Sequence, residues 1–182
     1  MDKPALRADM RARRAAFVRS LDHEERSRLL AALACRLSGL LPDTGIVAAY
    51  SAIGDEIDPA GIAALLGPRL ALPHFASRED PMCFRRAGGA LEAGPFRIPQ
   101  PTAAAERVDP DAVLVPLVAA DGDGNRLGQG QGHYDRALAG LARRKPIRTI
   151  GLAWDVQIVD RLDPDPWDVP LDRVVTPSRI LG

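Results

Sequence analysis

The sequence has no excess of charge and no long hydrophobic run. Its 182 residues contain 24 Lys+Arg and 24 Asp+Glu, so the formal net charge is zero. A general nucleic-acid-binding protein needs a basic surplus, so this balance predicts that the chain binds no nucleic acid. The apolar run at residues 112–120 has only nine residues, whereas a helix needs roughly 20 to span a bilayer. The sequence therefore predicts no membrane partner either.

Cysteine is also scarce, and the N-terminus lacks an apolar stretch. Cys35 and Cys83 stand far apart without a paired motif, which predicts free, buried thiols in a reducing compartment. Charged residues stand where a signal peptide would need apolar ones, so we expect a cytoplasmic protein. Hydrophobic residues make up 46% of the chain, an ordinary share for a globular protein. At about 150 residues per domain, the length predicts one domain over residues 1–182.

Helical and strand-like segments alternate after two opening helices. Asp2 and Asp22 are typical N-cap residues and predict the starts of this N-terminal helical pair. Buried strands are predicted at residues 46–50, 70–73, 112–115, 147–153 and 171–176, with helices at 58–67 and 134–144. Pro116 should end its strand's ladder or place that strand near an edge. Residues 74–110 look irregular, with a possible strand at 82–86. These patterns predict a single α/β domain with a mainly parallel, Rossmann-like sheet flanked by helices.

The most informative segment is the glycine-rich loop at residues 121–135, which has five glycines in 15 residues. Gly128, Gly130 and Gly132 alternate, so the backbone can approach a bulky anion without Cβ clashes. The helix that follows supplies free N–H groups and the positive end of its dipole. These features favour a phosphate cradle, but a flexible surface loop would have the same composition. The spacing matches neither a Walker A loop, nor a dinucleotide fingerprint, nor a calcium hand.

Several charged residues have two readings each. Asp135 lies in the first helical turn after the loop, where it either complements the helix dipole or binds Mg²⁺. Glu56 follows the first predicted strand, as a ligand contact or as part of a helix-capping cluster. A basic stripe runs beside the apolar stripe of the first helix, as a solvated face or as the wall of a cleft; it comprises Lys3, Arg7, Arg11 and Arg14.

The remaining histidines and tryptophans have simpler interpretations. His133 lies in the glycine-rich loop and is expected to touch ligand, whereas His23 and His74 are expected at the surface. Trp154 and Trp167 are expected to be packing residues.

Residues 125–136 read NRLGQGQGHYDR, and this segment resembles the signature of the 5-formyltetrahydrofolate cyclo-ligase family. Further matches follow in the family's order, among them Asp55-Glu56-Ile57-Asp58 and the segment from Asp168 to Asp172. The resemblance implies an ATP- and Mg²⁺-dependent ligase that closes 5-formyltetrahydrofolate to 5,10-methenyltetrahydrofolate through a phosphorylated formyl group. Two alternatives stay open: a non-catalytic folate- or nucleotide-binding relative, and an ATP-dependent enzyme acting on another pterin or amide.

The resemblance also implies roles for individual residues. An ATP site would comprise Lys3, Arg7, Arg126, Leu127, Gly128, Gln129, Gly130, Gln131, Gly132, His133 and Tyr134. The folate contacts would be Ser51, Glu56, His133 and Tyr134, the Mg²⁺ ligands Asp135 and Asp168, and the catalytic residues Arg126, Tyr134 and Asp135. The expected partners are the small molecules ATP and reduced folate, and the chain is expected to be a monomer or weak homo-oligomer. Three positions depart from the family pattern: many members have tyrosine in place of His133, histidine or another polar residue in place of Trp167, and phenylalanine in place of Ala120.

Overall fold

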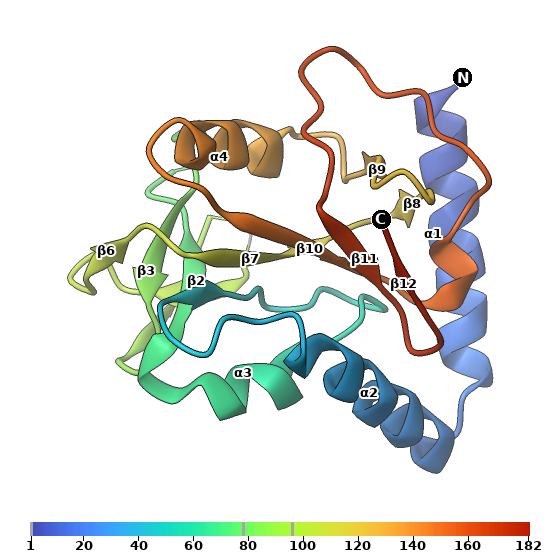
Figure 1. Ribbon diagram of the computed structural model, residues 1–182, viewed down its shortest axis with the longest axis horizontal. Helices are drawn as coiled ribbons and strands as arrows, with labels where there is room; N and C mark the ends of the chain where they lie inside the picture. Colours follow the sequence, from blue (N-terminus) through green and yellow to red (C-terminus); the bar gives the residue numbers. More distant parts are fainter. Residues whose placement is uncertain (1, 78, 96) are drawn as a thin grey trace.

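One eight-stranded sheet runs through the protein (Figure 1). The computed structural model describes residues 2–77, 79–95 and 97–182. The strand order is β12-β11-β10-β7-β1-β2-β3-β6. The parallel centre consists of β1 (Val47–Ala48), β2 (Leu70–His74), β7 (Ala112–Pro116), β10 (Arg148–Leu152) and β11 (Arg173–Val175). Antiparallel pairing extends both ends of the sheet: β3 (Cys83–Arg86) lies between β2 and the edge strand β6 (Arg107–Val108), and β12 (Ile180–Leu181) forms the other edge beside β11. The predicted α/β fold with a mainly parallel sheet is confirmed.

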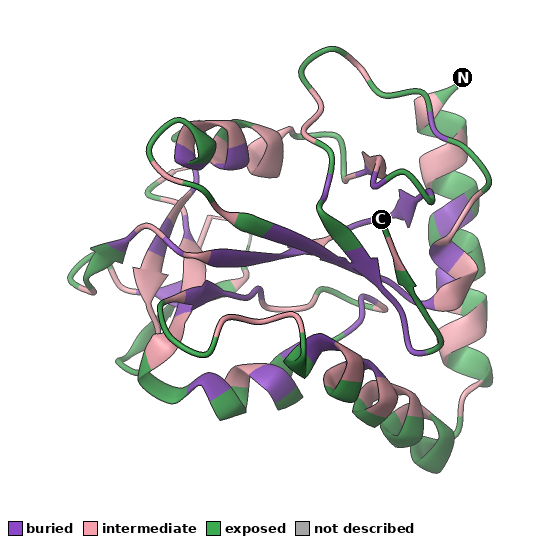
Figure 2. Ribbon diagram, viewed as in Figure 1, coloured by how far each residue is buried: buried purple, intermediate pink, exposed green. Residues whose placement is uncertain are grey.

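Helices cover both faces of the sheet (Figure 1). One face packs against α2 (His23–Ser38) and α3 (Ala60–Leu66), and the other against α4 (His133–Ala142). Alternate residues of one strand serve opposite faces: Val47 belongs to the first core and Ala48 to the second. The sheet is therefore buried along its centre, as the burial colours in Figure 2 show. Short 3₁₀ turns occupy Gly67–Arg69 (η1) and Asp155–Gln157 (η2).

The first helix, α1 (Lys3–Ser20), lies across one end of the molecule. The Asp2 carboxylate accepts a hydrogen bond from the Ala5 N–H at 3.1 Å, and Asp22 caps α2 in the same way. These bonds satisfy backbone donors that a helix start leaves free. Both predicted helix starts are confirmed. The buried Met10 side chain packs α1 against the segment after β7.

The short strands were the hardest to predict. Pro116 does end its ladder, but β7 lies in the middle of the sheet between β10 and β1. Residues 74–110 hold more strand than expected: besides β3 and β6, β4 (Leu91–Ala93) pairs with β5 (Pro99–Pro101). Another pair joins β8 (Ala119–Ala120), just before the glycine-rich loop, to β9 (Arg126–Leu127) within it. Pieces of two or three residues are too short to show an alternating pattern.

Some predictions of burial were wrong. His74 ends β2 and is 4% exposed, because β3 covers it on the sheet edge. Cys35 is free as expected but exposed, since it lies on the outer side of α2. Within the described residues, no helix is both long enough and apolar enough to cross a bilayer.

The burial of His74 predicts a loss of stability in acid. Burial and the charge of Arg85 lower its pKa from the ordinary 6.5, and Glu92, 3.7 Å away, only partly opposes this. The unfolded chain therefore binds the proton more readily, and stability falls as the pH drops below 6.5. We expect His74→Gln to flatten the pH dependence of the free energy of unfolding by about 1 kcal/mol per pH unit, measured in urea between pH 6.5 and 5. The exposed His23 supplies the control: if His23→Gln flattens the curve equally, burial is not the cause.

Candidate active site

The sheet reverses its order of construction between β1 and β7. The chain leaves β1 through α3 to β2 on one side, and later leaves β7 through α4 to β10 on the other. Such a reversal opens a crevice at the carboxyl ends of the two strands. Ser51 and Glu56 follow β1, and the glycine-rich loop follows β7. Together these segments line a cleft of about 750 Å³.

Asp121 organises the start of the glycine-rich loop. Its buried carboxylate accepts hydrogen bonds from the N–H groups of Asp123 and Asn125, each at 3.0 Å. Its second oxygen accepts from the Asn125 amide at 3.0 Å and from the Leu162 N–H at 2.9 Å. The acidic spacing that resembles a calcium hand is thus used to close a turn and to hold the 158–172 segment beside it.

The end of the loop is shaped by glycine. Gly130 and Gly132 have φ values of +96° and +64°, a region that other residues adopt only with strain. Gly132 is the N-cap of α4, and no side chain in the described residues caps that helix. Residues 132–135 at this helix start line the cleft, and a helix N-terminus is a favourable place for an anion.

The basic stripe of α1 faces this loop. The Arg7 Nε donates to the Gly128 carbonyl oxygen at 2.9 Å, and the Arg11 Nε donates to the Gln129 side chain at 3.1 Å. Arg14 is buried. Of the stripe, Lys3 and Arg7 line the cleft, whereas Arg11 is exposed and neither it nor Arg14 is among the lining residues.

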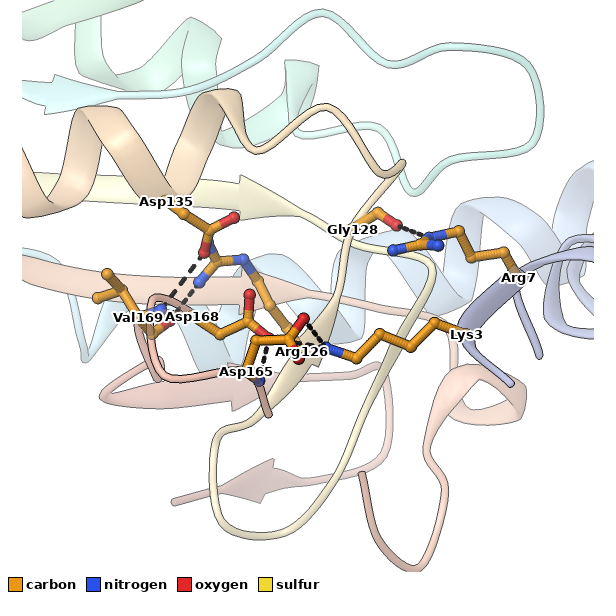
Figure 3. A network of polar contacts seen from close by, with 8 residues as sticks. All are labelled: Lys3, Arg7, Arg126, Gly128, Asp135, Asp165, Asp168 and Val169. Carbon is orange, nitrogen blue, oxygen red and sulfur yellow. Dashed lines mark hydrogen bonds and ion pairs between the residues drawn. The ribbon is translucent and has the colours of Figure 1, made fainter. Parts of the chain in front are cut away.

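Two clusters, each pairing a cationic side chain with carboxylates, lie next to each other in the cleft (Figure 3). In one, the Lys3 ammonium contacts the carboxylates of Asp165 and Asp168 at 2.6 and 3.1 Å. Burial lowers the pKa of Lys3, but the hydrogen bonds to these carboxylates outweigh burial, so its pKa is raised. Lys3 and Asp168 come from opposite ends of the chain, and their contact fixes the 158–172 segment against α1.

In the second cluster, the buried Arg126 guanidinium donates to Asp135 and to the Val169 carbonyl oxygen. The Val169 N–H donates to the same Asp135 carboxylate at 3.3 Å. Burial lowers the pKa of Arg126, and the charges of Asp135 and Asp168 both oppose that shift. The two predicted metal carboxylates thus flank a single guanidinium.

Glu56 lies deep in the cleft and is almost fully buried. One carboxylate oxygen accepts from the Gln129 amide at 3.0 Å and the other from the Ile53 N–H at 3.0 Å. Gln129 thereby links Glu56 to Arg11 of α1. The Ser51 hydroxyl donates to the Pro99 carbonyl oxygen at 3.1 Å.

His133 and Tyr134 start α4 with their rings in neutral form at physiological pH. Burial and the charge of Arg136 lower the pKa of His133, whose ring meets Phe75 edge-on at a centroid distance of 4.9 Å. Burial and the charge of Glu56 raise the pKa of the Tyr134 phenol well above its ordinary range. Tyr134 can therefore donate a hydrogen bond in the cleft.

The cleft brings together every residue of the predicted ATP, folate and metal sites. It also includes residues that the sequence did not single out. Phe75, Met82 and Ile98 form an apolar wall, and Asp165 shares Lys3 with Asp168. Trp167 was expected to pack in the core, which is wrong: it is 71% exposed and lines the cleft. Only the acidic spacing of residues 163–168 could have hinted at Asp165.

A divalent cation would find two carboxylates here, those of Asp135 and Asp168. Among the described residues, no group of three or more His, Cys, Asp or Glu side chains could hold a metal ion. Mg²⁺ commonly binds one or two carboxylates and takes its other ligands from phosphates and water. The donor set therefore fits Mg²⁺ that arrives with a phosphate chain, and does not fit a metal caged by protein alone.

The chain matches the family model described as the 5-formyltetrahydrofolate cyclo-ligase family over residues 1–177. It is 35% identical to a 5-formyltetrahydrofolate cyclo-ligase of Mycolicibacterium smegmatis over 159 residues, which is 79% of both chains. The cyclo-ligase of Escherichia coli strain K12 is 46% identical over 70 residues, so the match spans 38% of this chain and 38% of that relative's length. The NMR structure of Aquifex aeolicus 5,10-methenyltetrahydrofolate synthetase is similar with a TM-score of 0.81 and 32% identity, covering 100% of this chain and 92% of that one.

Proposed function

Because the chain belongs to the 5-formyltetrahydrofolate cyclo-ligase family, we propose that it closes 5-formyltetrahydrofolate to 5,10-methenyltetrahydrofolate at the expense of ATP. One observation carries the proposal: the glycine-rich loop, Lys3 and Arg7 of α1, and Glu56 line the same cleft at the switch point of the sheet. A phosphate-binding loop thus lies within reach of a buried carboxylate suited to bind a polar ring.

In the proposed reaction the formyl oxygen attacks the γ-phosphorus of ATP, and ADP leaves. The N10 amine then attacks the formyl carbon, N10 loses its proton, and phosphate departs as the methenyl bridge forms. A formyl oxygen is a poor leaving group, whereas a phosphate is a good one. The protein mainly has to align two substrates and neutralise phosphate charge.

The residues of the cleft suit this division of labour. Lys3, Arg7 and the N–H groups at the start of α4 would hold the phosphate chain. Glu56 would accept hydrogen bonds from the folate ring, and the neutral Tyr134 phenol would donate to the formyl or phosphoryl oxygen. Arg126 would position Asp135 and stabilise charge on the transferred group.

Asp135 and Asp168 would hold Mg²⁺ against the phosphates. When bound, the ion supplies positive charge to the phosphoryl oxygens during transfer. The protein itself would hold both carboxylates at one side of the cleft. The Val169 N–H donates a hydrogen bond to Asp135, and the Asp165 N–H donates one to Asp168.

We expect Lys3→Ala to raise the apparent KM for ATP about tenfold and to leave the KM for folate nearly unchanged. Lys3 lies among the phosphate-binding groups, and a charge-assisted hydrogen bond contributes about 1.5–3 kcal/mol. Steady-state kinetics with each substrate varied in turn would measure both constants. Arg13→Ala is the matched control, because Arg13 pairs with Asp9 on the exposed side of α1 and does not line the cleft among the described residues. Equal changes in both KM values would contradict a nucleotide-specific role.

The test of the proposed function is the near-ultraviolet absorbance of methenyltetrahydrofolate, formed from 5-formyltetrahydrofolate with and without ATP and Mg²⁺. An increase that needs both would support the cyclo-ligase. Binding of folate and ATP without product would favour a non-catalytic relative. Turnover of another reduced pterin, but not of 5-formyltetrahydrofolate, would favour a different ATP-dependent enzyme.

The balanced charge of the chain supports small-molecule partners only. ATP and reduced folate are thus its proposed partners, without nucleic acid or membrane. Its proposed state is a cytoplasmic monomer or weak homo-oligomer.

A further inference from the structure

The two tryptophans of the chain lie in opposite environments. Trp154 is fully buried, and its indole N–H donates to the Asp55 carbonyl oxygen at 3.1 Å. Trp167 is 71% exposed, and the exposed part of its indole borders the cleft. An exposed tryptophan on its own is unremarkable, so its meaning depends on how the segment that carries it is held.

That segment is a closed turn, fixed on both sides. The Asp165 N–H donates to the Asp168 carboxylate at 2.8 Å, and the Asp168 N–H donates to the Asp165 carbonyl oxygen at 2.9 Å. Lys3 holds both carboxylates from α1, and Arg126 holds the next residue, Val169, from the floor of the cleft. The turn therefore presents the indole in water on a backbone that is already ordered.

The cleft has a charged end and an apolar end. Asp165, Trp167 and Asp168 lie beside Lys3 at the charged end. The apolar lining consists of Phe75, just after β2, Met82, just before β3, and Ile98 and Pro99 at the start of β5. Trp167 is the aromatic side chain carried by the turn beside Lys3, whereas Phe75 meets His133 at the start of α4.

In ATP a flat purine is joined to the triphosphate through one ribose. If Lys3 holds the triphosphate, the purine of the same molecule lies near the charged end of the cleft. The indole is the large flat group that the 158–172 segment offers to the cleft there. A reduced folate, with its ring at Glu56, would occupy the apolar wall instead. Base–aromatic stacking needs no particular base edge, because every base presents a π-face.

We infer that Trp167 is a nucleotide-binding residue whose indole stacks on the purine of ATP, while Lys3 and the loop hold the phosphates. The inference rests on the proposed function for the assignment of the charged end to the nucleotide. It makes Trp167 a determinant of nucleotide affinity in this chain.

Tryptophan fluorescence tests the inference directly, because Trp154 supplies a constant buried background. Acrylamide quenching of the protein would be measured alone, with ADP, with inorganic tripolyphosphate and with 5-formyltetrahydrofolate. We expect ADP to protect the exposed tryptophan and the other two probes to leave it accessible. Protection by folate and not by ADP, or no protection by ADP at its saturating concentration, would overturn the inference.

Variants separate stacking from a structural role. Trp167→Ala should weaken ADP binding about tenfold in equilibrium titration, within the range seen when a base loses its aromatic partner. Its affinity for tripolyphosphate and for folate should not change, and Trp167→Phe should retain binding within about threefold. Leu65→Ala, at an equally exposed apolar position on α3, should behave as wild type. An equal loss for tripolyphosphate would show that the variant disturbs the turn, and would contradict stacking.

These measurements need no turnover, so they also separate this inference from the proposed reaction. ADP protection without methenyl product would leave the stacking role standing and overturn the cyclo-ligase. Product formation with a fully accessible Trp167 would overturn the stacking role alone.

Discussion

Asp135→Asn is expected to lower kcat for methenyl formation by about 10²–10³-fold while the chain stays folded. The amide keeps an oxygen that can accept from the Val169 N–H and from Arg126, so the local geometry survives. It loses the negative charge that the proposed Mg²⁺ needs, and an amide oxygen is a weaker ligand than a carboxylate. Absorbance kinetics would measure kcat, and circular dichroism with a thermal melt would establish that the variant is folded.

The control for this variant lies in the same loop. Asp123 is exposed and does not line the cleft, so Asp123→Asn should keep kcat within about twofold. Asp135→Ala should lose activity and also about 3 kcal/mol of the free energy of unfolding, because it leaves the buried Arg126 without its ion pair. Wild-type turnover by Asp135→Asn would exclude a charge-dependent role for this residue.

Arg126→Met should be the most damaging change outside the sheet core. The side chain joins the glycine-rich loop to α4 through Asp135 and to the 158–172 segment through the Val169 carbonyl oxygen. Methionine fills much of the same volume but leaves both acceptors unsatisfied, so we expect a loss of about 3 kcal/mol in urea unfolding and at least a hundredfold loss of kcat.

Arg126→Lys separates charge from geometry. Lysine keeps the charge but lacks the planar fork that reaches both partners at once. We expect near-normal stability and a kcat reduced about tenfold. Arg161→Met is the surface control, because Arg161 lies on an exposed part of the 158–172 segment. If Arg126→Met were as stable and as active as Arg161→Met, the bridging role would be wrong.

The parts of the fold that could be predicted are those with a local cause. A few adjacent residues are enough to predict the N-caps at Asp2 and Asp22 and the buried strand at 112–115. The glycine-rich loop could be located because its alternate glycines stand between a strand and a helix, although its composition alone fits a surface loop as well as a phosphate cradle. The basic stripe of α1 fits both a solvated face and the wall of a cleft, because the sequence of one helix does not show which segments pack against it.

The parts that could not be predicted depend on contacts across the chain. Asp165 becomes a partner of Lys3 only when the ends of the chain meet, 162 residues apart. His74 is buried because β3 folds back antiparallel on β2, and a four-residue strand carries little pattern. Trp167 was expected in the core because of its size, but the turn from Asp165 to Asp168 holds it outward.

The pairing of Lys3 with the carboxylates of Asp165 and Asp168 has a thermodynamic consequence. A phosphate chain that takes Lys3 leaves Asp165 and Asp168 short of positive charge, and a divalent cation that takes Asp168 frees Lys3. Binding of the phosphate chain therefore favours binding of the divalent cation, and the reverse. The coupling free energy is the same whichever of the two binds first. In the proposed enzyme the nucleotide should tighten Mg²⁺ binding by the factor by which Mg²⁺ tightens nucleotide binding. The cleft would then bind the nucleotide and Mg²⁺ together more tightly than it binds either one alone.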